Sequence, residues 1–289
     1  MENLSFADAA ALYMKNITQE NGPNIPIKKQ QLQQELIPYF SDTPLSRIRR
    51  FEIETFKDHM LGKGFAKATI NRYIAVLSNL LRRGEEWGWI DKMPVIIKYR
   101  EDNIKTRYLS ADEIQSLLAA AEADKCPVIA PFIHIALGTA MRRMEILSIR
   151  IDNINCENRE IFIPKAKTGA RMQPMTATLA RYLEDYLRTK IQPEQIFLFP
   201  AESSTGHRME IEKPFYRVVT AAGLDRYEVT RHTLRHTAIT HLVQAGVDLP
   251  TVQRFSGHRS LAMVFRYSHQ SREHLNKSLD QLDAKLNLP

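Results

Sequence analysis

The chain has 289 residues, of which 44% are hydrophobic and 25% charged, and its formal net charge is +7. These values exclude a disordered or fibrous protein, because the apolar fraction suffices for packed cores, and two cysteines are too few for a disulfide scaffold. The length suggests two domains, and the positive charge suits a polyanionic partner.

Membrane insertion and secretion are not expected. No apolar run approaches about 18 residues, so we predict no membrane span, and no signal peptide is visible. Cys126 and Cys156 stand alone, without the CxxC spacing of many metal and redox sites. Such cysteines are typical of reduced thiols in a cytoplasmic protein.

The first hundred residues have the pattern of a helical bundle. Apolar residues recur at helical spacing from Phe6 to Ile17, and a second helix is predicted from Lys29 to Leu36, ending before Pro38. The longest helix is predicted from Thr69 to Trp87, with one apolar face. Between them lies a further apolar stripe: Ile48, Phe51, Ile53, Phe56 and Met60.

Basic residues gather in two segments, 59–84 and 161–181, that contain no acidic residue. Separate basic segments suit a protein that surrounds a DNA duplex and neutralises several phosphates. Solvated helix faces give a similar pattern and remain the alternative. The side chains that we predict to contact DNA are Lys63, Lys67, Arg72, Arg82, Arg83, Lys165 and Arg171.

The helical periodicity breaks at residues 94–106. We therefore predict a linker at residues 99–107, which joins an amino-terminal domain, residues 1–98, to a carboxy-terminal domain, residues 108–289.

The second domain begins with a capping box, in which Ser110 and Glu113 satisfy free amides at a helix start. An apolar helix is predicted from Pro127 to Leu137. Two short extended runs, 160–164 and 171–174, flank a glycine-containing turn and predict a β-hairpin. Further helices are predicted at Leu179–Leu187 and Pro214–Ala222.

The chain closes with an amphipathic pattern of four leucines: Leu275, Leu279, Leu282 and Leu286. This pattern predicts a carboxy-terminal helix with one apolar face. The helix can pack on its own domain or on a neighbouring subunit, and the sequence leaves both open.

Five short motifs carry the chemistry of the second domain: TAMRRMEIL at 139–147, KTG at 167–169, HTLRH at 232–236, GH at 257–258 and RYSH at 266–269. Arginines and histidines suit a phosphodiester, because a guanidinium group bonds two phosphate oxygens at once and imidazoles move protons. Tyr267 can form a covalent intermediate. Glu145 follows Arg142 by three residues, so on a helix its carboxylate can hold the guanidinium in place.

The spacing of His232 and His236 also fits a zinc pair on a helix. The glutamate of an HExxH motif is missing, however, and no cluster of Cys, Asp or Glu stands nearby to complete a coordination shell. We therefore expect no metal site here.

The ordered set of motifs resembles the tyrosine recombinases, the phage-integrase family, across about residues 4–272. The resemblance implies a mainly α fold with a small antiparallel β-sheet, arranged as a two-domain DNA clamp. A helical core-site DNA-binding domain of the SAM-like type would precede the catalytic domain. It further implies a site-specific recombinase that needs no cofactor.

Residue roles follow from the resemblance position by position. Arg142 and Arg235 look like the arginines that clamp the scissile phosphate, and Tyr267 is similar to the nucleophile that forms a 3′-phosphotyrosine. Lys167 resembles the general acid for the departing 5′ oxygen, with Lys165 as its rival. His232 matches a histidine that transfers protons and contacts the phosphate, His258 matches one that bonds it, and Glu145 looks like the acid that braces the site.

Two departures from the family pattern stand beside these residues. Ala140 occupies a position where the family usually has glycine, and Ser256 replaces the usual leucine before Gly257 and His258. We expect the serine to loosen packing beside His258. The hairpin is also one residue shorter than is common, which keeps Lys165 in consideration.

The expected partners are double-stranded DNA with specific core sites, three further copies of the chain in a homotetramer on two sites, and accessory DNA-bending proteins. Two other functions stay open: a type IB topoisomerase-like nicking-closing enzyme, and a DNA-binding regulator whose active site has decayed. The presence of all six catalytic candidates argues against decay. A metal-dependent nuclease is the weakest alternative.

Overall fold

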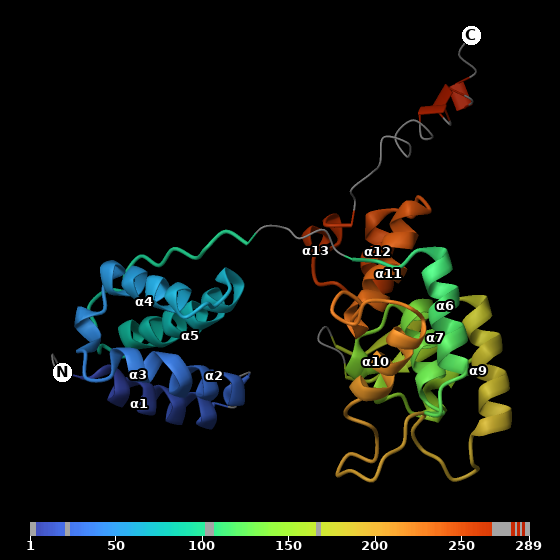
Figure 1. Cartoon of the computed structure of the whole chain (residues 1–289), viewed down its shortest axis with the longest axis horizontal. Helices are drawn as coiled ribbons and strands as arrows, with labels where there is room; N and C mark the ends of the chain where they lie inside the picture. Colours follow the sequence, from blue (N-terminus) through green and yellow to red (C-terminus); the bar gives the residue numbers. More distant parts are fainter. Residues whose placement is uncertain are drawn as a thin grey trace. The chain divides into compact units, whose positions relative to one another are not determined.

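The computed structural model describes residues 4–20, 24–101, 107–165 and 169–267, together with residues 279, 280, 282, 283, 285 and 286. It divides into two compact units, residues 1–103 and residues 104–289 (Figure 1). The described residues form many helices and one three-stranded antiparallel sheet, which confirms the predicted mainly α fold. None of the helices described is both long and apolar enough to cross a membrane.

The first unit is helical throughout its described part. Its α-helices are α1 (Phe6–Gln19), α2 (Ile25–Gln31), α3 (Ile37–Phe40), α4 (Arg50–Gly62) and α5 (Lys67–Glu86). A π-helical turn, η1 (Leu32–Leu36), joins α2 to α3, and a 3₁₀ turn, η2 (Leu45–Arg47), precedes α4.

The apolar periodicity explains helices α1 and α5. In α1 the Ser5 side chain accepts a hydrogen bond from the Asp8 amide at 3.1 Å, which satisfies a free donor at the helix start. The apolar stripe from Phe6 to Ile17 faces the core, as predicted. Helix α5 covers almost all of the predicted Thr69–Trp87 range and buries its apolar face against the same core.

The predicted end of the second helix before Pro38 is wrong. Helical backbone runs from Ile25 to Phe40, and Pro38 lies within it. In the π-helical turn before it, the Ile37 amide bonds to the Leu32 carbonyl, five residues back. This wider turn accommodates the proline, which has no N–H to donate and whose ring would crowd a regular α-helical turn.

The predicted apolar stripe of α4 also needs one correction, because Phe51 is 77% exposed. Ile53, Phe56 and Met60 lie in the core as predicted. These three residues follow the 3.6-residue period of one helix face, whereas Phe51 lies two residues before Ile53 and points away from it.

The segment after α5 has no helix or strand up to residue 101, yet it is bonded to the first unit. The Asn71 side-chain amide donates to the Tyr99 carbonyl and its oxygen accepts from the Tyr99 amide, both at 2.9 Å. Lys57 donates to the Ile97 carbonyl at 3.0 Å. The chain therefore leaves the first unit only after Tyr99.

Helix α7 (Ile129–Thr139) lies at the centre of the second unit, and nine of its 11 residues are buried. Helices α6 (Ala111–Glu122), α8 (Arg143–Leu147), α9 (Ala177–Lys190) and α11 (Arg231–Gln244) all pack against it (Figure 1). The predicted capping box of Ser110 and Glu113 starts α6.

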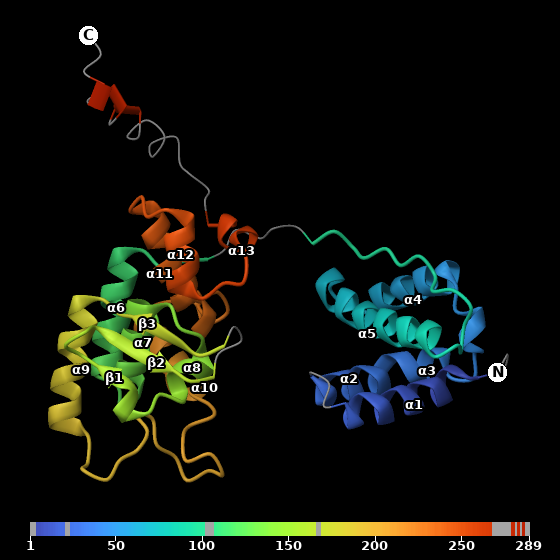
Figure 2. The ribbon, with the colours of Figure 1, turned by 180° about the vertical axis from the view of Figure 1, so that it is seen from behind.

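The sheet has the order β1-β2-β3, with strands β1 (Ile154–Asn155), β2 (Glu160–Ile163) and β3 (Arg171–Pro174). A 3₁₀ turn, η3 (Ile151–Asn153), leads into β1. Strands β2 and β3 form the predicted hairpin (Figure 2). In it, Ile161 pairs with Gln173. Residues 166–168 at its tip, Lys167 among them, lie outside the described residues.

Three further helices complete this unit: α10 (Glu212–Ala221), α12 (Leu249–Ser256) and α13 (Leu261–Phe265). Helices α11, α12 and α13 enclose a small apolar cluster separate from the main core, which includes Ile239, Val252, Val264 and Tyr267. Tyr267 is thereby fixed beside α11.

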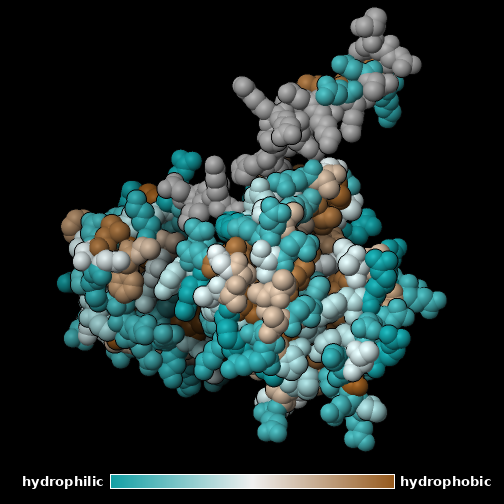
Figure 3. All heavy atoms as spheres, turned by 45° about the vertical axis from the view of Figure 1, so that its right-hand side comes forward, coloured by the Kyte–Doolittle hydropathy of each residue, from teal (hydrophilic) through white to brown (hydrophobic). Residues whose placement is uncertain are grey.

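The predicted carboxy-terminal helix is only partly within the described residues. Its six described positions are helical, and Leu279, Leu282 and Leu286 are about half exposed. Leu275 lies outside the described residues. Elsewhere the visible face of the molecule is largely hydrophilic, with apolar side chains scattered over it (Figure 3).

The close packing of α7 on α9 gives a stability prediction. A Cβ atom at Gly138 would lie 2.7 Å from Leu179 Cδ2 and 3.0 Å from its Cβ. We expect Gly138→Ala to lower the free energy of unfolding of the second unit by about 1–3 kcal/mol, because the backbones cannot separate without losing contacts. Urea unfolding followed by far-ultraviolet circular dichroism checks this.

Tryptophan fluorescence supplies an internal reference, because both tryptophans, Trp87 and Trp89, lie in the first unit. The fluorescence transition should not shift in Gly138→Ala. As a control, Gly62→Ala adds a methyl group with no atom within 4 Å and should be neutral or slightly stabilising. An unchanged dichroism transition in Gly138→Ala would contradict the packing described.

Candidate functional site

Helix α11 presents three basic side chains on one face. His232, Arg235 and His236 are spaced by three and four residues, so they line up along the helix. A capping box of Thr230 and Thr233 starts the helix, with the Thr230 amide donating to the Thr233 hydroxyl at 2.9 Å. This cap fixes the residue at which the helix begins, and therefore the positions of His232 and Arg235 along it.

Arg235 is buried, with 6% of its surface exposed. Its guanidinium donates to the carbonyl of Ala140, to the carbonyl of Ser256 at 2.7 Å, and to His258 Nε2 at 3.2 Å. Burial, and then the nearby Arg142, lower the pKa of Arg235 to about 10. The group stays charged near neutral pH, although none of these three partners is an anion.

The two carbonyls that hold Arg235 come from helix ends. Ala140 is the C-cap of α7, and Ser256 is the last residue of α12. Helix C-termini carry unpaired carbonyls and a partial negative charge, so they stabilise a cation. Arg142 is also held by a carbonyl at a helix end. Its Nη2 donates to the carbonyl of Gly257, the C-cap of α12, at 3.0 Å.

Both helix ends need a left-handed residue. Gly257 has φ = +64° and Ala140 has φ = +54°. The left-handed conformation at position 257 suits glycine, which has no Cβ. A Cβ at Gly257 would also lie 2.9 Å from the Arg171 guanidinium carbon. Ala140 adopts this conformation with its methyl group packed among the residues around Tyr267. Glycine adopts this left-handed conformation without strain, whereas the Cβ of alanine makes it costly.

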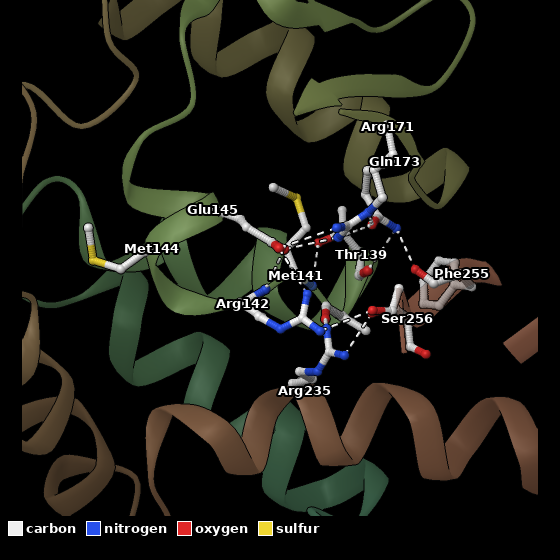
Figure 4. A network of polar contacts seen from close by, with 12 residues as sticks. Thr139, Met141, Arg142, Met144, Glu145, Arg171, Gln173, Arg235, Phe255 and Ser256 are labelled. Carbon is white, nitrogen blue, oxygen red and sulfur yellow. Dashed lines mark hydrogen bonds and ion pairs between the residues drawn. The ribbon is translucent and has the colours of Figure 1, made fainter. Parts of the chain in front are cut away.

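Glu145 holds two arginines at once (Figure 4). Its carboxylate accepts from Arg142 Nη1 at 3.0 Å and from Arg171 Nη1 and Nη2 at 3.2 and 2.9 Å. It also caps α8, accepting from the Arg142 amide at 3.1 Å. Burial raises the pKa of the Glu145 carboxyl, but hydrogen bonds from Arg171 and Arg142 outweigh it, so the pKa is lowered.

Gln173 ties the hairpin to this region (Figure 4). Its buried amide donates to the Thr139 carbonyl at 3.0 Å and to the Phe255 carbonyl at 2.9 Å, and its oxygen accepts from Arg171 at 3.1 Å. Strand β3 is thereby joined to the ends of α7 and α12.

His258 is fixed on both ring nitrogens. Nε2 accepts from Arg235, and Nδ1 lies 2.7 Å from the Ser256 hydroxyl. Because a guanidinium can only donate, Nε2 is unprotonated and the proton lies on Nδ1. Burial, then Arg235 and Arg142, lower the pKa of His258 to about 4. The expectation that Ser256 loosens packing is wrong, since this serine is fully buried and hydrogen bonded to His258.

Tyr267 belongs to the apolar cluster of α11, α12 and α13, with 6% of its surface exposed. Its hydroxyl is 2.6 Å from His236 Nδ1. Burial raises the pKa of the Tyr267 phenol, although Arg266 and Arg235 act in the opposite direction. Sequence reasoning considered His236 only as half of a zinc pair and missed this contact. Its position on the same helix face as His232 and Arg235 is the signal that could have shown it.

The His232 side chain is exposed at the start of α11. Burial, then Arg231 and Arg235, lower its pKa. The structure thus brings five of the six predicted catalytic residues into one unit, since Lys167 lies outside the described residues. Lys165 is described and exposed at the hairpin tip.

The residues predicted to contact DNA lie in different settings. In the first unit, Lys63 pairs with Glu35 at 2.6 Å and Arg83 with Glu20 at 2.7 Å. Arg171, in the second unit, is bonded to Glu145. Among the others, three are exposed on the first unit: Lys67, Arg72 and Arg82. Contact with DNA stays a prediction for all of them.

Among the residues that the structure describes, no group of three or more histidines, cysteines, aspartates or glutamates could hold a metal ion.

Comparison with known proteins identifies the family. The model of the phage integrase family matches residues 107–274, which are 168 of the 289 residues. The chain belongs to the phage integrase family. It is therefore a member of the tyrosine-type site-specific recombinases, as the sequence motifs predict.

Two relatives illustrate the similarity of this chain to known proteins. The tyrosine recombinase XerD of Caulobacter vibrioides is 28% identical over 237 residues, which cover 77% of each protein. The integrase of Salmonella phage P22 is 28% identical over 238 residues, which cover 77% of this chain and 59% of the phage protein.

Solved structures share the fold. The Tn1549 transposon integrase, in complex with transposon right-end DNA, aligns with a TM-score of 0.80 at 20% identity and covers 96% of this chain and 99% of its own. A lambda integrase dimer bound to a core site aligns with a TM-score of 0.74 at 18% identity, covering 92% and 95%.

The double ion pair of Glu145 gives the next prediction. We expect Glu145→Gln to lower the free energy of unfolding of the second unit by about 3 kcal/mol at pH 7, because two largely buried arginines lose their anion. The pKa of Glu145 is lowered in the folded protein, so its contribution is present above the unfolded pKa and disappears as the pH falls through the folded pKa.

The difference in the free energy of unfolding between the wild type and Glu145→Gln should therefore shrink as the pH is lowered below about 4. Urea unfolding followed by circular dichroism at several pH values measures it. Asp152→Asn breaks the exposed Arg150–Asp152 pair and should leave the unfolding midpoint unchanged. A Glu145→Gln variant as stable as the wild type at pH 7 would refute the bracing role.

Proposed function

We propose that this protein is a site-specific DNA recombinase that cleaves and rejoins DNA through a 3′-phosphotyrosine and exchanges strands through a Holliday junction. The observation that carries the proposal is the convergence of Arg142, Arg235, His258 and the Tyr267 cluster at the ends of α7 and α12. These groups supply positive charge, hydrogen-bond donors and a nucleophile to one place.

The scissile phosphate would bind beside the guanidinium groups of Arg142 and Arg235. Both are held by carbonyls at helix ends, so they are aligned before the substrate arrives. In the transition state the phosphorane gathers negative charge, and preorganised donors stabilise it most where water is excluded. Removal of one such donor typically slows catalysis about 10²–10³-fold.

Cleavage would proceed by in-line attack. The Tyr267 oxygen gives its proton to a base in the site and forms a bond to phosphorus, the bond from phosphorus to the 5′ oxygen breaks, and Lys167 protonates that oxygen as it leaves. The reverse attack by a 5′ hydroxyl from another strand restores the phosphodiester and frees the tyrosine. Since the phosphotyrosine bond conserves the energy of the phosphodiester, the cycle needs no ATP.

The remaining groups would support these steps. Glu145 orients Arg142. His258 would bond the phosphate through Nε2, which takes up a proton once the substrate has displaced its bond with Arg235. We assign His232 to contact with the phosphate and to proton transfer. Lys165, exposed at the hairpin tip, remains the rival of Lys167 as general acid.

The first unit would act as the core-site DNA-binding domain and, with the catalytic domain, clamp a duplex. Its exposed basic side chains on α5, Arg72 and Arg82, suit contacts with phosphates. Four copies would assemble on two core sites in the cytoplasm, with DNA-bending proteins as accessory factors.

Covalent trapping tests the proposal. A suicide duplex, nicked near the scissile position and taken from the junctions of the element that encodes this protein, should give a DNA–protein band on a denaturing gel in EDTA. The band should be absent with Tyr267→Phe, because the phenylalanine has no nucleophilic oxygen.

Arg235→Ala serves as a second variant, expected to slow band formation about 10²–10³-fold. Binding to a confirmed site with no covalent band in the wild type would favour the decayed regulator. Rapid relaxation of supercoiled plasmids that lack the site would favour the topoisomerase-like enzyme.

Deletion of residues 275–289 tests assembly. If the carboxy-terminal leucines pack on a neighbouring subunit, the truncated protein should occupy a single half-site with unchanged affinity but lose cooperative binding to a paired site. Gel-shift titration on half-sites and paired sites measures both. Cooperative binding that survives the deletion would discard packing of this segment on a neighbouring subunit.

A further inference from the structure

The nucleophilic hydroxyl of Tyr267 lies 2.6 Å from Nδ1 of His236, with the ring centroids 5.6 Å apart. Both side chains are largely enclosed: His236 projects from the middle of α11, and Tyr267 belongs to the apolar cluster beside it. None of the roles assigned above involves His236.

The direction of this hydrogen bond follows from the protonation states. Burial raises the pKa of the Tyr267 phenol, so the hydroxyl carries its proton. Burial, then His232 and Arg266, lower the pKa of His236 to about 4, so its ring is neutral. Within the described residues the hydroxyl has this one hydrogen-bond partner, so the phenol donates and the unprotonated Nδ1 accepts.

We propose that His236 is the general base that takes the phenolic proton of Tyr267 during cleavage. The proposal rests on the recombinase function argued above and deepens it. As the Tyr267 oxygen forms its bond to phosphorus, the O–H bond breaks and the proton moves to His236 Nδ1. The bond from phosphorus to the 5′ oxygen breaks, and that oxygen takes a proton from the general acid. Religation reverses each transfer.

Bound DNA makes this transfer more favourable. The charged and titratable groups that act on His236 are His232 and Arg235 from α11, Arg266 from the end of α13, and His258 after α12. The arginines disfavour a second cation in the free protein. A phosphate anion beside Arg235 offsets their charge, and it brings the pKa of His236 closer to neutral pH, where a general base is most effective.

His236 is better placed for this step than His232. Nδ1 of His236 is within hydrogen-bond distance of the reacting oxygen, and a general base is identified first by such geometry. His232 lies one helical turn earlier, beside Arg231 and Arg143, where contact with the phosphate suits it.

Single-turnover cleavage of the suicide duplex tests the role of His236 with two substitutions. His236→Ala removes the acceptor. His236→Asn places an amide oxygen near the position of Nδ1, so it can hold the hydroxyl but cannot take the proton. We expect both variants to cleave about 10²–10⁴-fold more slowly than the wild type while binding DNA equally well. His134→Asn, which alters a histidine hydrogen-bonded to Glu122, is the matched control and should cleave normally.

Two further measurements separate the base from the acid. Added imidazole should restore part of the activity of His236→Ala and leave the wild type unaffected. A duplex with sulfur in place of the 5′ bridging oxygen has a leaving group that needs no proton. It should rescue Lys167→Ala and should not rescue His236→Ala.

The pH profile provides an independent readout. Above pH 7 His236 is already neutral, so the wild-type cleavage rate should be nearly flat. In His236→Ala the rate should rise about tenfold per pH unit up to pH 9, because attack then depends on the small fraction of ionised tyrosine.

Wild-type cleavage rates in His236→Asn would overturn the proposal, because the contact would then only position the tyrosine. Rescue of His236→Ala by the sulfur substrate would also overturn it, since the defect would lie at the leaving group. A wild-type protein that forms no covalent complex on its confirmed site would instead refute the proposed function. The two failures are therefore distinguishable.

Discussion

The catalytic unit depends on helix carbonyls that hold arginines without neutralising them. Arg235 is buried between the carbonyl ends of α7 and α12, and Arg142 bonds to the carbonyl of Gly257 at the end of α12. A buried charge without an anion is costly, and the partial negative charge of two helix ends offsets only part of that cost. The site thus retains positive charge that a phosphate can neutralise.

Much of the surrounding structure follows from this constraint. The left-handed turns at Ala140 and Gly257 end the two helices where their carbonyls are needed, and Gln173 joins those ends to strand β3. Glu145, the carboxylate of this network, is shared between Arg142 and Arg171. The same positive field, together with burial, keeps His236 and His258 neutral. Neutral imidazoles can accept protons and hydrogen bonds, whereas imidazolium groups cannot.

Local signals in the sequence predicted most of the fold. The apolar periods of α1 and α5, the capping box of Ser110 and the turn of the β-hairpin each depend on residues close together in the chain. The failures depend on wider context. Pro38 stays within a helix because a π-helical turn precedes it. Phe51 is exposed because it lies two residues before the buried Ile53, which places its side chain on a different face of α4.

In the candidate site, too, the sequence predicted some features and missed those that depend on tertiary packing. Motif residues such as Arg142, Arg235 and Tyr267 could be chosen from sequence, because the family resemblance assigns their roles. The contact of His236 with Tyr267 joins residues 31 positions apart, and its geometry is set by the packing of α11 against the segment after α13. Likewise the hydrogen bond of Ser256 with His258 depends on the turn at Gly257.

The central claim is that Tyr267 carries the DNA during the reaction, and mass spectrometry of the trapped complex tests it most directly. After nuclease and trypsin digestion, a nucleotide should be found attached through its 3′ phosphate to Tyr267, within a peptide that ends at Arg272. Attachment to a serine, a histidine or another tyrosine would contradict the account, whatever the strength of the covalent band.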